Sequence, residues 1–240
     1  MPQRRLIFNA DDFGYSKGVN EGIIESHVKG IVTSTSVMVL RKFAYEASSL
    51  KKFPKLSIGL HLDMTEPGFQ MWKDLSYIFL MKNSDIESAF LLQLEKFEEL
   101  VGKMPDHIDG HNHVHKHPKV WPIVKKYAIE KNIPIRDASV AKFRIDFFGK
   151  SAFGYDKTEK VSSEALIKLI KKLPRGTYEI VCHPAKDPMN DLSLRSTNTG
   201  YLHQRALELK TLTDPSVIEF IENEGSISLI NWKDVPAAIV

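Results

Sequence analysis

The feature that most constrains the fold of this chain is the alternation of short apolar segments with longer amphipathic ones. Most of the short segments are continuous apolar runs, which is typical of strands that are buried on both faces. They comprise residues 6–8, 31–40, 56–62, 107–109, 133–135, 178–182 and 227–230. Strands that alternate with helices form crossover units, and such units build a parallel sheet.

The segments between these runs are predicted to be helices. In the first, Ser16 is a good N-cap, Val19, Ile23 and Ile24 form an apolar stripe, and Gly30 can end the helix. The others cover residues 86–101, 119–131, 163–173, 202–212 and 216–223. About seven repetitions favour an α/β fold of the irregular (β/α) barrel type, TIM-barrel-like and with about seven parallel strands, over an open sheet.

Two segments fit this alternation poorly. Residues 63–83 and 143–155 are long and carry several aromatic side chains. They are either surface loops held down by those aromatic residues or the wall and lid of a pocket, and the sequence does not choose between the two.

Composition narrows the class of protein. The single cysteine cannot form an internal disulfide, which is expected in a reducing compartment. The apolar run at residues 6–8 is far too short for a signal peptide, and no later run approaches the roughly 18 residues of a spanning helix. With 33 Lys and Arg against 30 Asp and Glu, the net charge of +3 is not that of a nucleic-acid or membrane binder. We therefore expect one cytoplasmic catalytic domain over residues 1–240, with a homo-oligomer left open.

Ionisable residues follow nearly every strand-like run at its carboxyl end. In a (β/α) barrel these ends meet on one face, where active sites are built. Residues far apart in the sequence are therefore expected to form one site. They are Asp11 and Asp12 after the first run, His61 after the third, Asp109 and His111 after the fourth, Arg136 after the fifth and His183 after the sixth.

These residue types suggest metal chemistry. One carboxylate with two imidazoles is a common set of ligands for a catalytic divalent ion, and Asp12, His61 and His111 can supply it. Asp11 would then be a second carboxylate, free to act as a general base on a metal-bound water. Because neighbouring strand residues point to opposite faces, both aspartates reach one site only if the chain leaves the sheet there.

Residues 107–117 hold five of the nine histidines. His111 and His115 are four residues apart, and so are His113 and His117, so spacing alone does not choose the ligand. His115 is a possible additional ligand, and Asp109 can orient a ligand histidine. The alternative is a nonspecific metal-affinity tract.

Three other features have simpler explanations than catalysis. Ser16 lies in a G-x-S-x-G pattern, but only fifteen residues precede it, so helix capping explains it better than a nucleophile elbow. Cys182 precedes His183 in a strand, so the two side chains point apart and the thiol is expected in the core. His27 is expected to pack on the first helix.

Five motifs together resemble the YdjC-like carbohydrate deacetylases, a family that includes the chitooligosaccharide deacetylases. They are N-A-D-D-F-G at 9–14, G-I-V-T-S-T at 30–35, G-L-H at 59–61, H-I-D-G-H-N-H-V-H at 107–115 and C-H-P at 182–184. The resemblance covers almost the whole chain. It implies an irregular (β/α) barrel and metal-dependent removal of acetyl groups from N-acetylated sugars. The segment between His61 and the histidine tract is shorter than in the chitooligosaccharide enzymes, which leaves the particular sugar open.

By position, this resemblance implies that Asp12, His61 and His111 bind the metal, that Asp11 is the base and that His183 is the acid. The ligand types favour Zn²⁺ or Co²⁺, while the family resemblance suggests Mg²⁺.

Arg136 either orients Asp11, binds the small carbohydrate substrate or forms a structural ion pair. Two other functions stay open. A metal-dependent phosphoesterase would need a cluster of basic residues, for which Arg136 and either Arg195 or Arg205 are the candidates. A non-catalytic metal- or sugar-binding protein would have no use for Asp11.

Overall fold

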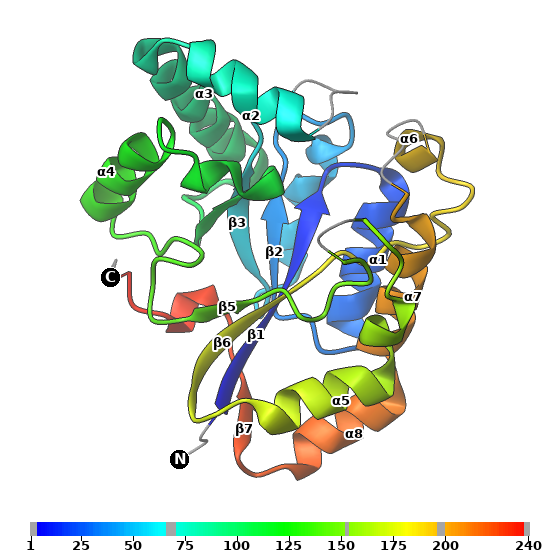
Figure 1. The fold of residues 1–240 in the computed structure, drawn as a ribbon. Coiled ribbons are helices and arrows are strands. Elements are labelled where there is room, and N and C mark those ends of the chain that lie inside the picture. The colour runs from blue at the N-terminus through cyan, green and yellow to red at the C-terminus, as the bar shows by residue number, and fades with distance from the viewer. Residues whose placement is uncertain (1–3, 66–70, 152–153, 196–199, 238–240) are drawn as a thin grey trace.

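This computed structural model describes residues 4–65, 71–151, 154–195 and 200–237, with the backbone alone for 71–75. In these residues, seven parallel strands form one curled sheet (Figure 1). The strands are β1 (Arg4–Phe13), β2 (Ser34–Val37), β3 (Ser57–Leu62), β4 (Ile108–Gly110), β5 (Lys142–Arg144), β6 (Gly176–Cys182) and β7 (Ile227–Leu229). Their order is β4-β3-β2-β1-β6-β5, and β7 pairs with β1. The predicted α/β fold with a TIM-barrel-like parallel sheet is confirmed.

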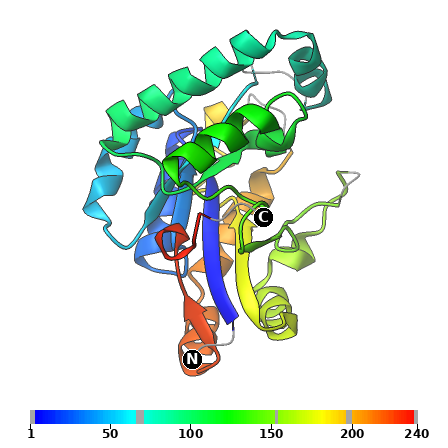
Figure 2. The same cartoon turned by 90° about the vertical axis from the view of Figure 1, so that its left-hand side faces the viewer.

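β1 is the centre of the sheet. One edge of β1 pairs with β6 from Arg4 to Ala10, and Figure 2 shows these two strands side by side. The other edge is shared, because β7 pairs with Arg4–Leu6 and β2 pairs from Asn9 onward. The side chains of the consecutive residues Leu6, Ile7 and Phe8 are fully buried, as expected of a strand covered on both faces.

Helices cover the outside of the sheet. They are α1 (Lys17–Val28), α2 (Met71–Leu80), α3 (Asn83–Val101), α4 (Trp121–Lys131), α5 (Ser163–Lys172), α6 (Leu192–Arg195), α7 (Leu202–Leu212) and α8 (Pro215–Asn223). Short 3-10 helices are η1 (Ala44–Lys52), η2 (His111–Lys116), η3 (Thr158–Val161) and η4 (Trp232–Asp234). The predicted N-cap is found, because the Ser16 hydroxyl accepts from the Val19 amide. The C-cap of α1 is Lys29, one residue before the predicted Gly30, and Gly102 ends α3 at φ 79°.

Two predictions about secondary structure were wrong. The run at residues 133–135 makes a single parallel bridge, from Ile135 to Ile108. Pro134 has no amide hydrogen, and the left-handed residues Asn132 and Asp137 turn the chain on both sides, so no longer ladder forms. The strand that was missed is β5, which pairs with β6.

The segment at residues 63–83 is not only loop, because α2 lies within it. Its residues 66–70, which include Phe69, lie outside the described part of the chain. In the other long segment, 143–155, the described residues after β5 form mainly loop.

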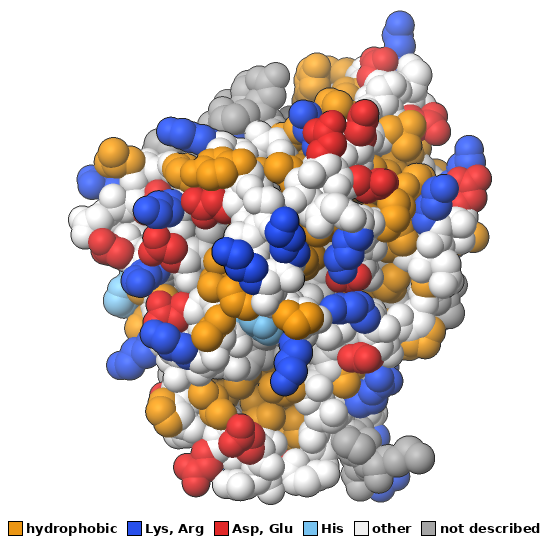
Figure 3. Space-filling model, turned by 180° about the vertical axis from the view of Figure 1, so that it is seen from behind, with side chains coloured by type: hydrophobic (Ala, Val, Ile, Leu, Met, Phe, Trp, Pro, Cys, Tyr) orange, Lys and Arg blue, Asp and Glu red, His pale blue; other side chains and the backbone are white. Residues whose placement is uncertain are grey.

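The surface carries both signs of charge. Seen from behind, Lys and Arg side chains are interspersed with Asp and Glu (Figure 3). Among the helices described, none combines the length and the apolar character that crossing a membrane requires.

Candidate active site

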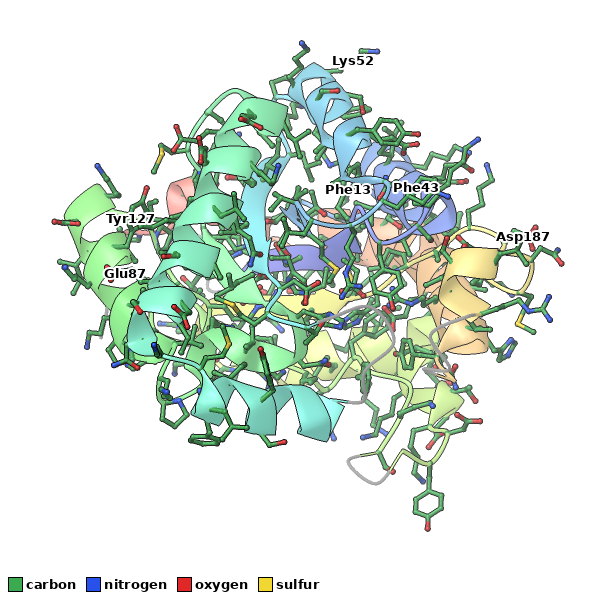
Figure 4. The ribbon with its side chains drawn as sticks, turned by 90° about the horizontal axis from the view of Figure 1, so that it is seen from above. Phe13, Phe43, Lys52, Glu87, Tyr127 and Asp187 are labelled. Atoms are coloured by element: carbon green, nitrogen blue, oxygen red, sulfur yellow. The ribbon has the colours of Figure 1, made fainter. Side chains whose placement is uncertain are left out.

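Asp11 and Asp12 lie at the carboxyl end of β1, which Figure 4 views from above, with Phe13 labelled at the end of the strand. The sequence suggested that the chain leaves the sheet at these two residues, but β1 continues to Phe13. Instead, the pairing of β1 with β2 shifts between Ala10 and Phe13, and Asp12 adopts φ 73°. Such an irregularity re-aims a side chain within a strand, so two consecutive carboxylates reach the same region.

Asp12, His61 and His111 form a compact group of possible metal ligands. The Asp12 Oδ1 atom lies 3.4 Å from His61 Nε2 and 3.2 Å from His111 Nδ1. Metal–ligand bonds of about 2 Å at tetrahedral or octahedral angles separate ligand atoms by roughly 2.8–3.4 Å. The three residues, which come from β1, β3 and the start of η2, therefore fit a divalent ion.

His61 is fixed in the orientation that this site needs. Its Nδ1 atom lies 2.8 Å from Asp109 Oδ1 and 3.1 Å from the Ser36 hydroxyl, which leaves Nε2 facing Asp12. Burial alone would lower the pKa of His61, but the carboxylates of Asp109 and Asp11 outweigh it and raise the pKa well above its ordinary value. A carboxylate that binds the far nitrogen of a ligand histidine is a common support for a metal site.

The histidine tract does not form one regular helix face. Asn112 and His113 have left-handed backbones, at φ 51° and 58°, so the four-residue spacing of His111 and His115 does not place them on one helix face. His115 is fully buried, and within the described structure neither of its ring nitrogens has a hydrogen-bond partner. Burial lowers its pKa to about 3. His113 meets the Phe143 ring at 5.3 Å.

The first histidine of the tract lies apart from the candidate ligands. The His107 ring stacks on Trp232, with centroids 4.9 Å apart, and both side chains are fully buried. The tract therefore divides into different environments and is not one metal-affinity surface.

Arg136 organises the second carboxylate. Its guanidinium donates two hydrogen bonds of 2.7 Å to the two oxygens of Asp11, and it also contacts Glu179 at 2.7 Å and Asp109 at 2.7 Å. Burial would raise the pKa of Asp11, but the charge of Arg136 outweighs it and lowers the pKa. These contacts fit two of the three roles considered for Arg136, orientation of Asp11 and a structural ion pair, because the guanidinium also binds Glu179 and Asp109. Its side chain is only 1% exposed.

Asp11, His61 and Asp109 form a second group of close ligand atoms. Arg136 already bridges Asp11 and Asp109, and His61 already contacts Asp109 through Nδ1. A guanidinium therefore occupies the position that a cation would take, and the Asp12 group is the better candidate for a metal.

His183 follows β6 and is half-buried at the same face. Its ring meets Phe148 at 5.7 Å and Tyr201 at 6.0 Å, both edge to face. Burial lowers its pKa to about 4, against the opposing charges of Asp12 and Asp11. The preceding Cys182 is fully buried in the core, as predicted, and burial raises the pKa of its thiol well above the ordinary value.

The sequence did not point to the buried residues Glu179 and Glu208, and it gave Arg205 a different role. Arg205 was considered only as a phosphate ligand, but it contacts Asp12 Oδ2 at 2.6 Å. Glu179 lies inside β6, and an acid within an apolar strand was the signal that could have revealed it. Glu208 is fully buried on α7.

A sequence model of the YdjC-like proteins matches residues 5–223. The chain belongs to this family. A carbohydrate deacetylase of Geobacillus stearothermophilus is 35% identical over 250 residues, covering 96% of this chain and 98% of that protein. Other relatives at 31–37% identity carry the names carbohydrate deacetylase or chitooligosaccharide deacetylase.

Solved structures share the fold of this chain. A protein of Enterococcus faecalis, whose name refers to cellobiose-phosphate cleavage, is 27% identical with a TM-score of 0.77, and the alignment covers 96% of this chain and 98% of that one. A family 4 carbohydrate esterase of Streptomyces lividans shares the fold at 11% identity, with a TM-score of 0.55 and coverage of 96% and 93%.

Proposed function

We propose that this chain is a metal-dependent deacetylase, acting as a single catalytic domain, that hydrolyses the acetamide group of an N-acetylated mono- or oligosaccharide. One observation carries the proposal: a possible metal site of Asp12, His61 and His111 lies beside a second carboxylate, Asp11, which Arg136 fixes separately. Relatives named as carbohydrate deacetylases over nearly the whole chain support the same substrate class.

The metal site would take one divalent ion. Two imidazoles and a carboxylate suit Zn²⁺ or Co²⁺, and the family resemblance suggests Mg²⁺; all three ions are divalent. When bound, such an ion polarises the amide carbonyl and makes a water molecule more acidic.

Asp11 is the proposed general base. Its pKa is lowered by Arg136 against the effect of burial, so the carboxylate is ionised at neutral pH and can accept a proton from the attacking water. Asn9 and Arg136 hold its two oxygens, at 2.7 Å each, which restricts the carboxylate to one orientation.

His183 is the proposed general acid. Because burial lowers its pKa to about 4, the imidazole enters the reaction neutral at pH 7. As negative charge develops on the substrate, the imidazole takes up a proton from solvent and passes it to the departing sugar nitrogen while the carbon–nitrogen bond breaks. Asp11 then returns to solvent the proton that it accepted from the attacking water. The products are acetate and the free amino sugar.

The arginines around the site favour an amide over a phosphate substrate. Arg136 is paired with Asp11, Arg205 with Asp12, and Arg41 with Asp63 at 2.6 Å. Phosphoryl groups are bound by basic side chains that are available to the substrate. These three side chains are already engaged by carboxylates.

The test is a substrate panel with the purified protein. We expect acetate release from N-acetylglucosamine, its dimer or larger oligomers, and no phosphate release from phosphomonoesters. Phosphate release without acetate release would favour the phosphoesterase. If metal binds and the Asp11→Asn variant behaves like the wild type in every assay, the non-catalytic binding protein is favoured.

A further inference from the structure

One face of α7 carries polar side chains into the interior. Tyr201, just before the helix, and Arg205 and Glu208 within it are spaced by four and three residues, so they lie on the same face. Tyr201 and Arg205 are each 5% exposed and Glu208 is fully buried. Burying such groups is costly unless they bind partners, so their partners indicate what the face does.

The partners belong to the candidate site. Glu208 accepts hydrogen bonds from the backbone amide of His183 and from the Tyr201 hydroxyl. Arg205 donates to the backbone carbonyl of His183 at 3.3 Å and to Asp12 Oδ2 at 2.6 Å. Two residues of one helical turn therefore bind both backbone polar groups of His183, and one of them also binds the candidate metal ligand.

The His183 side chain has little other support. Its Nδ1 atom is buried and has no hydrogen-bond partner among the described residues. The ring is flanked by Tyr201 and Phe148, whose own rings stack at 4.5 Å. The position of the imidazole is therefore set mainly by how its backbone is held.

We infer that Arg205 and Glu208 are positioning residues, which fix the His183 imidazole relative to Asp12 for proton transfer to the departing amine. The inference rests on the proposed function, because it requires His183 to be the general acid. It goes further in assigning the placement of that acid to α7.

This role has a signature in the leaving group. An amine cannot depart from a tetrahedral intermediate without a proton, whereas 4-nitrophenolate departs without one. Moving the imidazole therefore slows amide hydrolysis more than hydrolysis of an activated ester. General loss of structure slows both reactions to the same extent.

The experiment compares Glu208→Gln and Arg205→Lys with the wild type. Gln at position 208 has one acceptor oxygen and cannot accept hydrogen bonds from both the His183 amide and the Tyr201 hydroxyl. Lys at position 205 can keep the contact with Asp12 but loses the hydrogen bond to the His183 carbonyl. We expect kcat for the N-acetylglucosamine dimer to fall about tenfold or more, and kcat for 4-nitrophenyl acetate to change by less than about threefold. Bound metal should be unchanged. His203→Ala, an exposed change on the same helix, is the control.

Equal losses on both substrates, or no loss on either, would overturn the inference. If Glu208→Gln does not fold, Arg205→Lys gives the same comparison. A second measurement is independent of turnover: the ring ¹⁵N signal of His183, assigned with His183→Ala, should broaden or shift in both variants. An unchanged signal would contradict the inference. A wild type that releases no acetate from any N-acetylated sugar refutes the proposed function instead.

Discussion

Asp12 has φ 73° inside β1, a conformation that costs a non-glycine residue about 1–3 kcal/mol and persists only where the surroundings enforce it. Here the strained residue separates the tasks of two consecutive carboxylates. Asp12 faces His61 and His111, while Asp11 binds Arg136. The sequence indicated that both aspartates reach the site, but not that a strand irregularity, with the strand continuing, is the means.

The role of Asp11 is tested by Asp11→Asn. The amide keeps the shape of the side chain but cannot accept the water proton, so kcat should fall by about 10²–10⁴. Because Arg136 keeps Glu179 and Asp109 as partners, the variant should stay folded and bind metal. Steady-state kinetics and elemental analysis measure both properties. A variant with near wild-type kcat would exclude Asp11 as the base.

The choice of ligand within the histidine tract gives a matched pair of variants. His111→Ala removes an atom 3.2 Å from Asp12 Oδ1 and should abolish metal binding. His113→Ala, whose ring packs on Phe143, should retain the metal. Metal content after dialysis distinguishes them. Loss of metal from His113→Ala but not from His111→Ala would show that His111 is not the ligand.

At the scale of elements, the strand β6 carries a buried acid next to the base. Burial raises the pKa of Glu179 to about 7 from 4.5, in spite of the charge of Arg136. Between pH 4.5 and about pH 7, the Glu179 carboxyl holds a proton in the folded protein that it has released in the unfolded chain. The stability that Glu179 contributes therefore decreases as pH rises through this range and is constant above about pH 7.

Glu179→Gln removes this dependence. Relative to wild type, the variant should become more stable on going from pH 5 to pH 8, by up to about 3 kcal/mol at about 1.4 kcal/mol per pKa unit. Urea denaturation of the metal-free proteins at the two pH values measures the change. Glu219→Gln, on the exposed surface of α8, should show no such trend. A difference that is the same at both pH values would contradict the raised pKa.

The G-L-H motif on β3 has a packing explanation. A methyl group on Gly59 would lie 2.2–2.5 Å from the His107 ring, which is buried against Trp232. Gly59→Ala should therefore destabilise the protein by about 1–3 kcal/mol and disturb His61 two residues later. Gly225→Ala is the control, because nothing lies within 4 Å of its added methyl. Equal melting temperatures for the two variants would show that β3 accommodates the methyl.

The elements were predictable to different degrees. Helical periodicity and caps located α1, α3, α5, α7 and α8 closely, because amphipathic stripes and a residue such as Ser16 act locally. The sequence did not predict that residues 133–135 form only a single bridge while β5 forms a strand. Whether a short segment becomes a strand depends on the strand that pairs with it.

At the scale of the whole molecule, the site exists because parallel strands end on one face. From this rule the sequence predicted one site for seven residues at strand ends. They are Asp11, Asp12, His61, Asp109, His111, Arg136 and His183. The rule did not predict the contact of Arg205 with the site, because Arg205 lies on the helix α7. A pattern of strands does not indicate which helical side chain points inward. Family resemblance was confirmed by relatives that cover nearly the entire chain.

The proposed deacetylation requires one divalent ion, bound by Asp12, His61 and His111. The most direct measurement is acetate release from the N-acetylglucosamine dimer by chelator-treated protein as metal is added back. We predict no activity without metal and a linear recovery that ends at one ion per chain, with no recovery in His61→Ala. Full activity of the metal-free protein, or recovery in His61→Ala equal to wild type, would contradict the account.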